Sequence, residues 1–130
     1  MCLIIENDEN LISKIAIEDI IVYKILTNDL ISPYLQYQYE YNIINESVLD
    51  SPQKYRTEQK YKIRKGFHSL MYLDETFKLL SMFEIYYYPV RIYRCIIPKS
   101  SEYYIGKFNF NSLLTIESIT SNKIIIKERI

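Results

Sequence analysis

The hydrophobic pattern of this chain consists mainly of short apolar runs that are rich in β-branched and aromatic residues. Such runs occupy residues 20–26, 90–97 and 103–108. Apolar runs of about four to eight residues, bounded by turn-forming residues, are typical of strands. We therefore predict a strand at each of these positions. Residues 20–26 are expected to form a central strand because this run is rich in β-branched residues.

Shorter or interrupted runs predict the remaining strands. Residues 1–5 predict a brief strand or a packed tail, and residues 62–70 predict a further strand. Residues 113–119 and 123–127 predict two more strands, with Thr120-Ser121-Asn122 as the hairpin connection between them.

Polar and aromatic residues alternate strictly from residue 36 to residue 41, with the period of a strand that has one buried face. Tyr37, Tyr39 and Tyr41 would then line the core face. They form either an aromatic stripe that packs on the sheet or a ligand cleft lined by rings. The polar residues 42–59 that follow predict a long loop, and such loops often serve as lids or mobile insertions.

A helical pattern follows at about residues 74–85. Asp74 is expected to cap this helix, and Phe77, Leu80 and either Phe83 or Glu84 mark its faces at spacings of three to four residues. One principal helix with a twisted, mostly antiparallel sheet defines an α+β fold. A chain of 130 residues fits a single globular domain over residues 1–130.

Charge and composition change this picture little. The chain has 16 Lys and Arg residues against 16 Asp and Glu residues, so it lacks the overall positive field on which nonspecific nucleic-acid binding depends. Nucleic acid is therefore not an expected partner. Isoleucine occurs 23 times and alanine once, a bias that codons rich in A and T produce. The 14 tyrosines are accordingly not taken as a signal for base stacking.

Cys2 and Cys95 lie far apart without a CxxC motif, so neither a metal site nor a disulfide framework is expected. Cys95 lies in a predicted strand and should be a buried, inert thiol. Cys2 would become an N-terminal nucleophile if Met1 were removed, and otherwise it is a small packed hydrophobe. The sequence leaves the removal of Met1 open.

No apolar run reaches the length of about 18 residues that a membrane span requires, and the first residues lack the pattern of a secretion signal. We therefore expect an intracellular, soluble protein with no membrane partner.

The strongest candidate for a site is the segment Gly66-Phe67-His68-Ser69, which precedes the predicted helix. It carries one of only two glycines and the sole histidine. A glycine within a strand usually marks a bulge or the close approach of a backbone or a ligand. His68 is either a general base or ligand-binding residue, or a structural histidine whose hydrogen bonds are satisfied.

Basic residues precede this segment, among them Arg64 and Lys65. They indicate either a solvated strand edge guarded by lysine or a groove for an anionic ligand. We take His68, Ser69, Gly66, Lys24, Arg64, Lys65 and Tyr23 as candidate ligand-binding residues, and the identity of any ligand or cofactor is unknown.

Several short motifs resemble those of a family of small, uncharacterised proteins from large DNA viruses and phages. They occur in the family's order over nearly the whole chain and include Met1-Cys2-Leu3-Ile4, Val22-Tyr23-Lys24, Ser32-Pro33-Tyr34, Gly66-Phe67-His68-Ser69, Cys95-Ile96-Ile97-Pro98-Lys99 and Tyr103-Tyr104-Ile105-Gly106-Lys107-Phe108. The resemblance implies a viral or phage protein that acts in the host cytoplasm.

A more distant resemblance is to the ADP-ribosyltransferase-like fold, through the strand with Val22-Tyr23-Lys24, the segment Gly66-Phe67-His68-Ser69 and a third strand with Arg94-Cys95-Ile96-Ile97. It implies that Lys24 stands where the family has His or Arg, that Ser69 stands for the Ser or Tyr of the second strand, and that Glu102 or Glu117 is the catalytic glutamate.

Three functions follow as hypotheses. The first is a binding module for a nucleotide-like or other small anionic ligand. The second is a divergent ADP-ribosyltransferase that uses NAD. The third is an interaction module that binds a host protein through tyrosine-rich surfaces.

Overall fold

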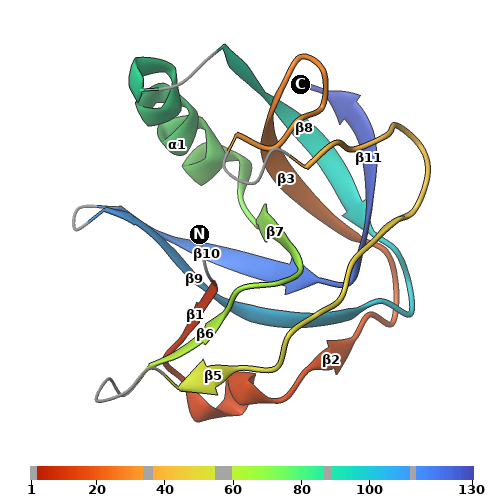
Figure 1. Cartoon of the computed structure of the whole chain (residues 1–130), viewed down its shortest axis with the longest axis vertical. Helices are drawn as coiled ribbons and strands as arrows, with labels where there is room; N and C mark the ends of the chain where they lie inside the picture. The colour runs from red at the N-terminus through yellow and green to blue at the C-terminus, as the bar shows by residue number, and fades with distance from the viewer. Residues whose placement is uncertain (1–2, 34–36, 55–59, 87–88, 112–113) are drawn as a thin grey trace.

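A curved, mostly antiparallel sheet and one α-helix make up the computed structural model of the chain (Figure 1). The structure describes residues 3–33, 37–54, 60–86, 89–111 and 114–130. All pairs between its named strands are antiparallel, and the order along the sheet is β4-β11-β8-β3-β7-β10-β9-β1-β6-β5, with β2 paired to β9. The predicted α+β class is confirmed.

The elements follow one another in a simple order along the chain. They are β1 (Leu3–Ile5), a short 3-10 helix (Asp8–Leu11), β2 (Lys14–Ile15), β3 (Ile20–Thr27), β4 (Asn45–Glu46), β5 (Gln53–Lys54), β6 (Tyr61–Ile63), β7 (Phe67–Leu70), α1 (Leu73–Tyr86), β8 (Val90–Ile97), β9 (Glu102–Asn111), β10 (Leu114–Ser121) and β11 (Lys123–Arg129). The predictions of a strand at residues 20–26, 90–97 and 103–108 are confirmed, and β3 lies in the middle of the sheet as expected.

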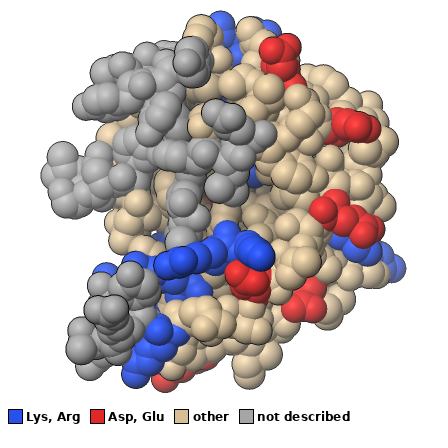
Figure 2. Space-filling view, in the orientation of Figure 1, with Lys and Arg blue, Asp and Glu red and all other residues tan. Residues whose placement is uncertain are grey.

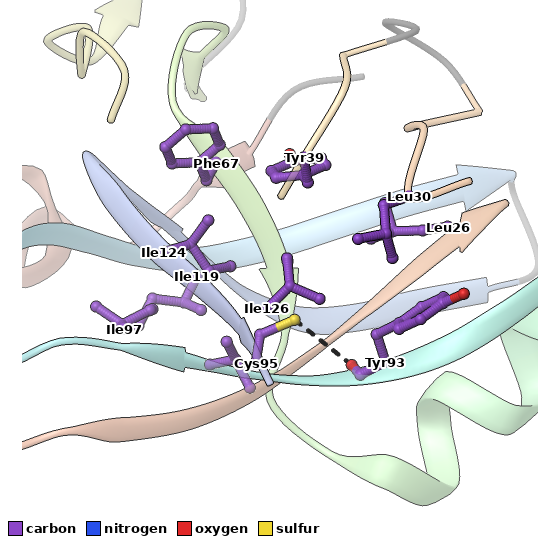
Figure 3. Packing of buried hydrophobic residues seen from close by; sticks show 11 residues of the cluster. Leu26, Leu30, Tyr39, Phe67, Tyr93, Cys95, Ile97, Ile119, Ile124 and Ile126 are labelled. Carbon is purple, nitrogen blue, oxygen red and sulfur yellow. Dashed lines mark hydrogen bonds between the residues drawn. The ribbon is translucent and has the colours of Figure 1, made fainter. Parts of the chain in front are cut away.

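The largest core cluster lies on the concave face of β3, β8 and β11. Val22 and Leu26 from β3 pack there with Tyr93 and Cys95 of β8, and these four residues are at most 1% exposed. Figure 3 shows this cluster. Tyr39 and Phe67 face each other over this cluster, with ring centroids 5.6 Å apart. Burial of so many apolar side chains is the main stabilising contribution to such a fold.

A second cluster lies between the sheet and α1, which packs against β8, β3 and β7. Leu79 of α1 is buried there against Ile25, Leu70 and Ile92 of the strands. Successive strand residues point to opposite faces, so Ile25 lies in this cluster while Lys24 belongs to the other face, with Val22 and Leu26. Because of this alternation, the Lys24 side chain reaches toward β7 from the face that carries Val22 and Leu26.

Four local predictions require correction. The first is the hairpin between residues 113–119 and 123–127, since β10 pairs with β7 and β9 whereas β11 pairs with β8 and β4. Thr120 and Ser121 extend β10 and leave Asn122 alone between the strands. One residue is too short for the two-residue turn of a tight hairpin, so the chain turns a corner, where the Asn122 side chain accepts a hydrogen bond from the Glu102 amide.

The second correction concerns residues 36–41. In the described part of this segment only isolated bridges form, at Gln38 and Tyr41. Tyr39 is 5% exposed, whereas Tyr37 and Tyr41 are 39% and 45% exposed, so the three rings do not share one buried face. The long loop predicted after this segment is interrupted by β4 and β5, and residues 55–59 lie outside the described part of the chain.

The third correction is the strand predicted over residues 62–70. It divides into β6 and β7, which take separate places in the sheet, and Gly66 lies at the break with φ of 140°. A side chain at this φ is strained. A Cβ atom there would also lie 2.5 Å from Thr120 Cγ2 and 2.9 Å from Leu49 Cδ1. Glycine is therefore needed at residue 66 for both reasons.

The fourth correction concerns α1. The helix begins at Leu73, so Asp74 lies in its first turn and not at the capping position. In the first turn its negative charge still stabilises the helix through the helix dipole. Thr76 and Leu79 form the buried face, whereas Phe77 is 49% exposed. The side chains of Phe83 and Glu84 lie outside the described part of the chain. No helix among the described residues has the length and apolar character to cross a membrane.

We expect Gly66→Ala to lower the free energy of unfolding by about 2 to 4 kcal/mol, because strain and steric overlap add. Urea unfolding monitored by circular dichroism measures this loss. The adjacent variant Lys65→Ala removes an exposed side chain and should change the value by less than about 0.5 kcal/mol. Equal stability of the two variants would show that glycine is not required at residue 66.

Candidate functional site

The candidate site lies where β3 and β7 separate. These strands share a single ladder pair, Tyr23 with Leu70. Continued antiparallel pairing would place Lys24 opposite Ser69 and Ile25 opposite His68, but no further ladder pair forms. The sheet is thus open between two of its central strands, and backbone groups on both sides need other partners.

A pocket of about 80 Å³ occupies this opening. Residues from both faces of the sheet line it, together with one side of α1 and the segment before Tyr39. They are Leu3, Tyr23, Lys24, Ile25, Ser32, Pro33, Tyr39, Gly66, His68, Ser69, Leu70, Leu79, Phe108 and Ser118. The pocket therefore brings together five of the seven residues predicted from the sequence, namely Tyr23, Lys24, Gly66, His68 and Ser69.

Lys24 is the cationic group of this pocket. Its side chain is 8% exposed, and its ammonium group donates a hydrogen bond to the backbone carbonyl oxygen of His68. The ammonium nitrogen also lies 5.1 Å from the centroid of the Tyr39 ring, within the range of a cation–π contact. Among the described residues no carboxylate lies within ion-pairing distance of Lys24. A buried charge without a counter-ion is costly. One of the three N–H donors of the ammonium group binds the His68 carbonyl, so two are left for a ligand.

Ser69 supplies a neutral polar group to the same pocket. The residue is 2% exposed, and its hydroxyl oxygen has no hydrogen-bond partner within the described structure. Buried hydroxyl groups are normally satisfied, because an unsatisfied one costs about 1 to 3 kcal/mol. Ser118, which also lines the pocket, shows the usual arrangement, since its hydroxyl donates to the carbonyl oxygen of Ile116 at 3.0 Å. Ser69 thus differs from Ser118 in that its buried hydroxyl group is unsatisfied.

His68 uses both ring nitrogens within the protein. Nδ1 lies 2.7 Å from Thr120 Oγ1, and Nε2 lies 2.9 Å from the carbonyl oxygen of Arg64. These partners fit a neutral ring that donates from Nε2 to the carbonyl and accepts at Nδ1 from the threonine hydroxyl. The pKa of His68 is lowered from 6.5 to about 4, mainly by burial and to a smaller extent by the nearby charge of Lys24. The contacts are those of the structural histidine, one of the two alternatives for this residue.

The remaining basic candidates lie elsewhere. Arg64 and Lys65 are exposed and do not line the pocket, although the backbone of Arg64 holds the His68 ring. Figure 2 shows Lys and Arg side chains gathered over the region of β1, β5 and β6, with acidic side chains among them. Lys60, for example, lies 3.3 Å from a carboxylate oxygen of Glu6. This surface has mixed charge and is separate from the pocket around Lys24.

The glutamates that the transferase resemblance implies lie outside the set of residues that line the pocket. Glu102 pairs with Ile15 of β2 at the start of β9, and Glu117 lies opposite Lys107 on β9. Neither of them lines the pocket with Lys24 and Ser69, and no other described carboxylate does.

Several pocket residues were not predicted from the sequence as site residues. Tyr39 is absent from the candidate ligand-binding residues, although a ligand cleft lined by rings is one of the two alternatives for its segment. Leu3, Leu79 and Phe108 carry no signal for a site other than hydrophobicity. They reach the pocket only through tertiary structure. Ser32 and Pro33 belong to one of the motifs of the viral-family resemblance, and no signal in the sequence indicates that they border a pocket.

No group of three or more metal-ligating side chains occurs among the described residues. Cys95 is a free, buried thiol, as predicted, and burial raises its pKa to about 12. Cys2 lies outside the described residues. Comparisons with protein families, with curated proteins and with solved structures find no match to this chain.

The depressed pKa of His68 predicts a pH-dependent stability. Between pH 6.5 and pH 4 the unfolded chain binds a proton that the folded protein rejects, so stability should fall as the pH is lowered through this window. The full pKa shift corresponds to a loss of about 3 kcal/mol in the free energy of unfolding. This loss is absent above pH 6.5, because neither the folded nor the unfolded state then binds the proton. Urea unfolding of the wild type and of His68→Gln at pH 7 and pH 4 should show the wild type losing about that much more than the variant. Equal losses would show that His68 does not titrate in this way.

Proposed function

We propose that this protein binds a small anionic ligand in the pocket between β3 and β7. The observation that carries the proposal is the presence of a buried ammonium group without a described carboxylate partner and a buried hydroxyl group without any partner in one cavity. Each group would cost stability in a purely structural role, and a bound anion would satisfy both.

The electrostatic argument depends on the location of Lys24. In the low effective dielectric of a protein interior, an ammonium group attracts an anion more strongly than it does in water, and salt screens this attraction less. The hydrogen bond to the His68 carbonyl and the contact with the Tyr39 ring hold the amine in place before a ligand arrives. Such a preorganised group loses little side-chain entropy on binding.

The transferase alternative has less support at the site. It requires a glutamate beside Lys24 and Ser69, and among the described residues none lines the pocket. The interaction alternative rests on exposed rings, of which Tyr37, Tyr41 and Tyr72 are 39%, 45% and 46% exposed. These rings are not accompanied by any feature that specifies a partner. The viral or phage origin and the host cytoplasm stay predictions from the sequence.

Lys24→Met is expected to abolish binding of small anions while keeping the volume and the apolar stem of the side chain. Thermal unfolding in the presence of acetate, butyrate, phosphate and ADP provides the measurement, because a ligand that binds the folded state raises the melting temperature. The exposed Lys107→Met, outside this pocket, is the matched control and should respond to anions as the wild type does. If no anion stabilises the wild type, or if both variants respond alike, the proposal fails.

Ser69→Ala should have opposite effects on stability and on binding. Removal of an unpartnered buried hydroxyl group should raise the free energy of unfolding by about 1 kcal/mol, whereas the loss of a ligand contact should weaken anion binding. Ser118→Ala serves as the comparison, since its hydroxyl is satisfied and its removal should lower stability by about 1 kcal/mol. Denaturant titrations of both variants decide the point. A loss of stability in Ser69→Ala would indicate a structural role for its hydroxyl.

A further inference from the structure

The charge in the pocket limits the charge of its ligand. Lys24 is the only Lys or Arg among the described lining residues, and His68 is neutral above its lowered pKa. A monoanion would be neutralised by this single ammonium group. A phosphate dianion or a nucleoside diphosphate would leave excess negative charge in a partly apolar cavity, which is strongly unfavourable.

The volume limits the size of the ligand. A cavity of 150 Å³ lined by apolar residues accommodates benzene, and a buried water requires roughly 10 to 15 Å³. A cavity of about 80 Å³ therefore holds about three to six heavy atoms. A nucleoside does not fit within this volume, whereas a carboxylate group with a few carbons does.

The remaining lining limits the chemistry of the ligand. Apart from Lys24 and Ser69, the pocket wall includes aliphatic and aromatic side chains from four elements, namely Leu3 of β1, Ile25 of β3, Leu79 of α1 and Phe108 of β9. All four are at most 8% exposed. A ligand that fills the pocket must therefore carry an apolar part next to its charged group.

From these three limits we propose that the ligand is a short-chain monocarboxylate of about two to four carbons. Its carboxylate accepts hydrogen bonds from the Lys24 ammonium and the Ser69 hydroxyl, and its alkyl part contacts the aliphatic wall. This assignment rests on the proposed function and specifies its ligand class, replacing the nucleotide-like ligand suggested by the sequence.

Isothermal titration calorimetry of the full chain with formate, acetate, propionate, butyrate and hexanoate tests the assignment. Affinity should rise by about fourfold for each added carbon up to butyrate, because each methylene leaves water, and it should not rise further for hexanoate. Butyramide, which is neutral and nearly the same shape, should bind about tenfold more weakly than butyrate. For ligands of this size the dissociation constant should be no tighter than about micromolar.

A pair of variants tests the apolar part of the assignment. Ile25→Val removes one carbon from the pocket wall and should shift the preferred ligand toward a chain one carbon longer. Ile92→Val removes the same carbon from the neighbouring position on β8, which is buried in the same cluster but does not line the pocket, and should leave the preference unchanged. Both variants retain a folded core, since this substitution costs only about 0.5 to 1.5 kcal/mol.

The outcomes separate this inference from the proposed function. If phosphate or ADP binds better than butyrate and Lys24→Met abolishes that binding, the pocket takes anions but the monocarboxylate assignment is wrong. The assignment also fails if affinity is independent of chain length, or if both isoleucine variants shift the preference equally. If none of the anions binds, both the assignment and the proposed function fail.

Discussion

The arrangement of the pocket depends on the interruption of pairing between β3 and β7. A sheet stabilises its backbone by pairing every strand with its neighbours, yet these two central strands share one ladder pair. The side chain of Lys24 takes over part of the missing ladder by donating to the His68 carbonyl. Because a lysine side chain here replaces a backbone N–H as the donor, a positive charge lies inside the fold. An intact ladder would not require such a charge.

The groups around this opening have different tasks. His68 is fixed by a threonine and a backbone carbonyl, stays neutral, and presents its own carbonyl to Lys24. Gly66 allows the chain to leave β6 and enter β7 at an angle that other residues resist. The segment singled out by its glycine and histidine thus builds the wall and holds the amine, whereas Lys24 and Ser69 are the groups with unused hydrogen-bonding capacity.

Much of the fold could be predicted because its strands carry strong local signals. Residues 20–26 and 90–97 are β-branched runs with clear ends, and β3 and β8 match them closely. The errors arose where tertiary contacts override local pattern. The alternation at residues 36–41 suggested a strand, but only Tyr39 packs inward. Likewise, short spacing suggested a hairpin at Asn122, although the strands on either side join different neighbours. For the site, sequence reasoning found Lys24, His68 and Ser69 but missed Ser118 and included two exposed basic residues that lie outside the pocket. The apolar wall depends on contacts between distant elements that no local pattern encodes.

The segment between Tyr41 and Lys54 has a consequence for how the protein keeps its sheet from pairing with other chains. This single stretch supplies β4 at one end of the strand order and β5 at the other. Exposed sheet edges are templates for aggregation, and proteins usually protect each edge separately. Here one piece of backbone shields both, so a single proteolytic cut within it would loosen two edges together and turn a local nick into a risk of self-association.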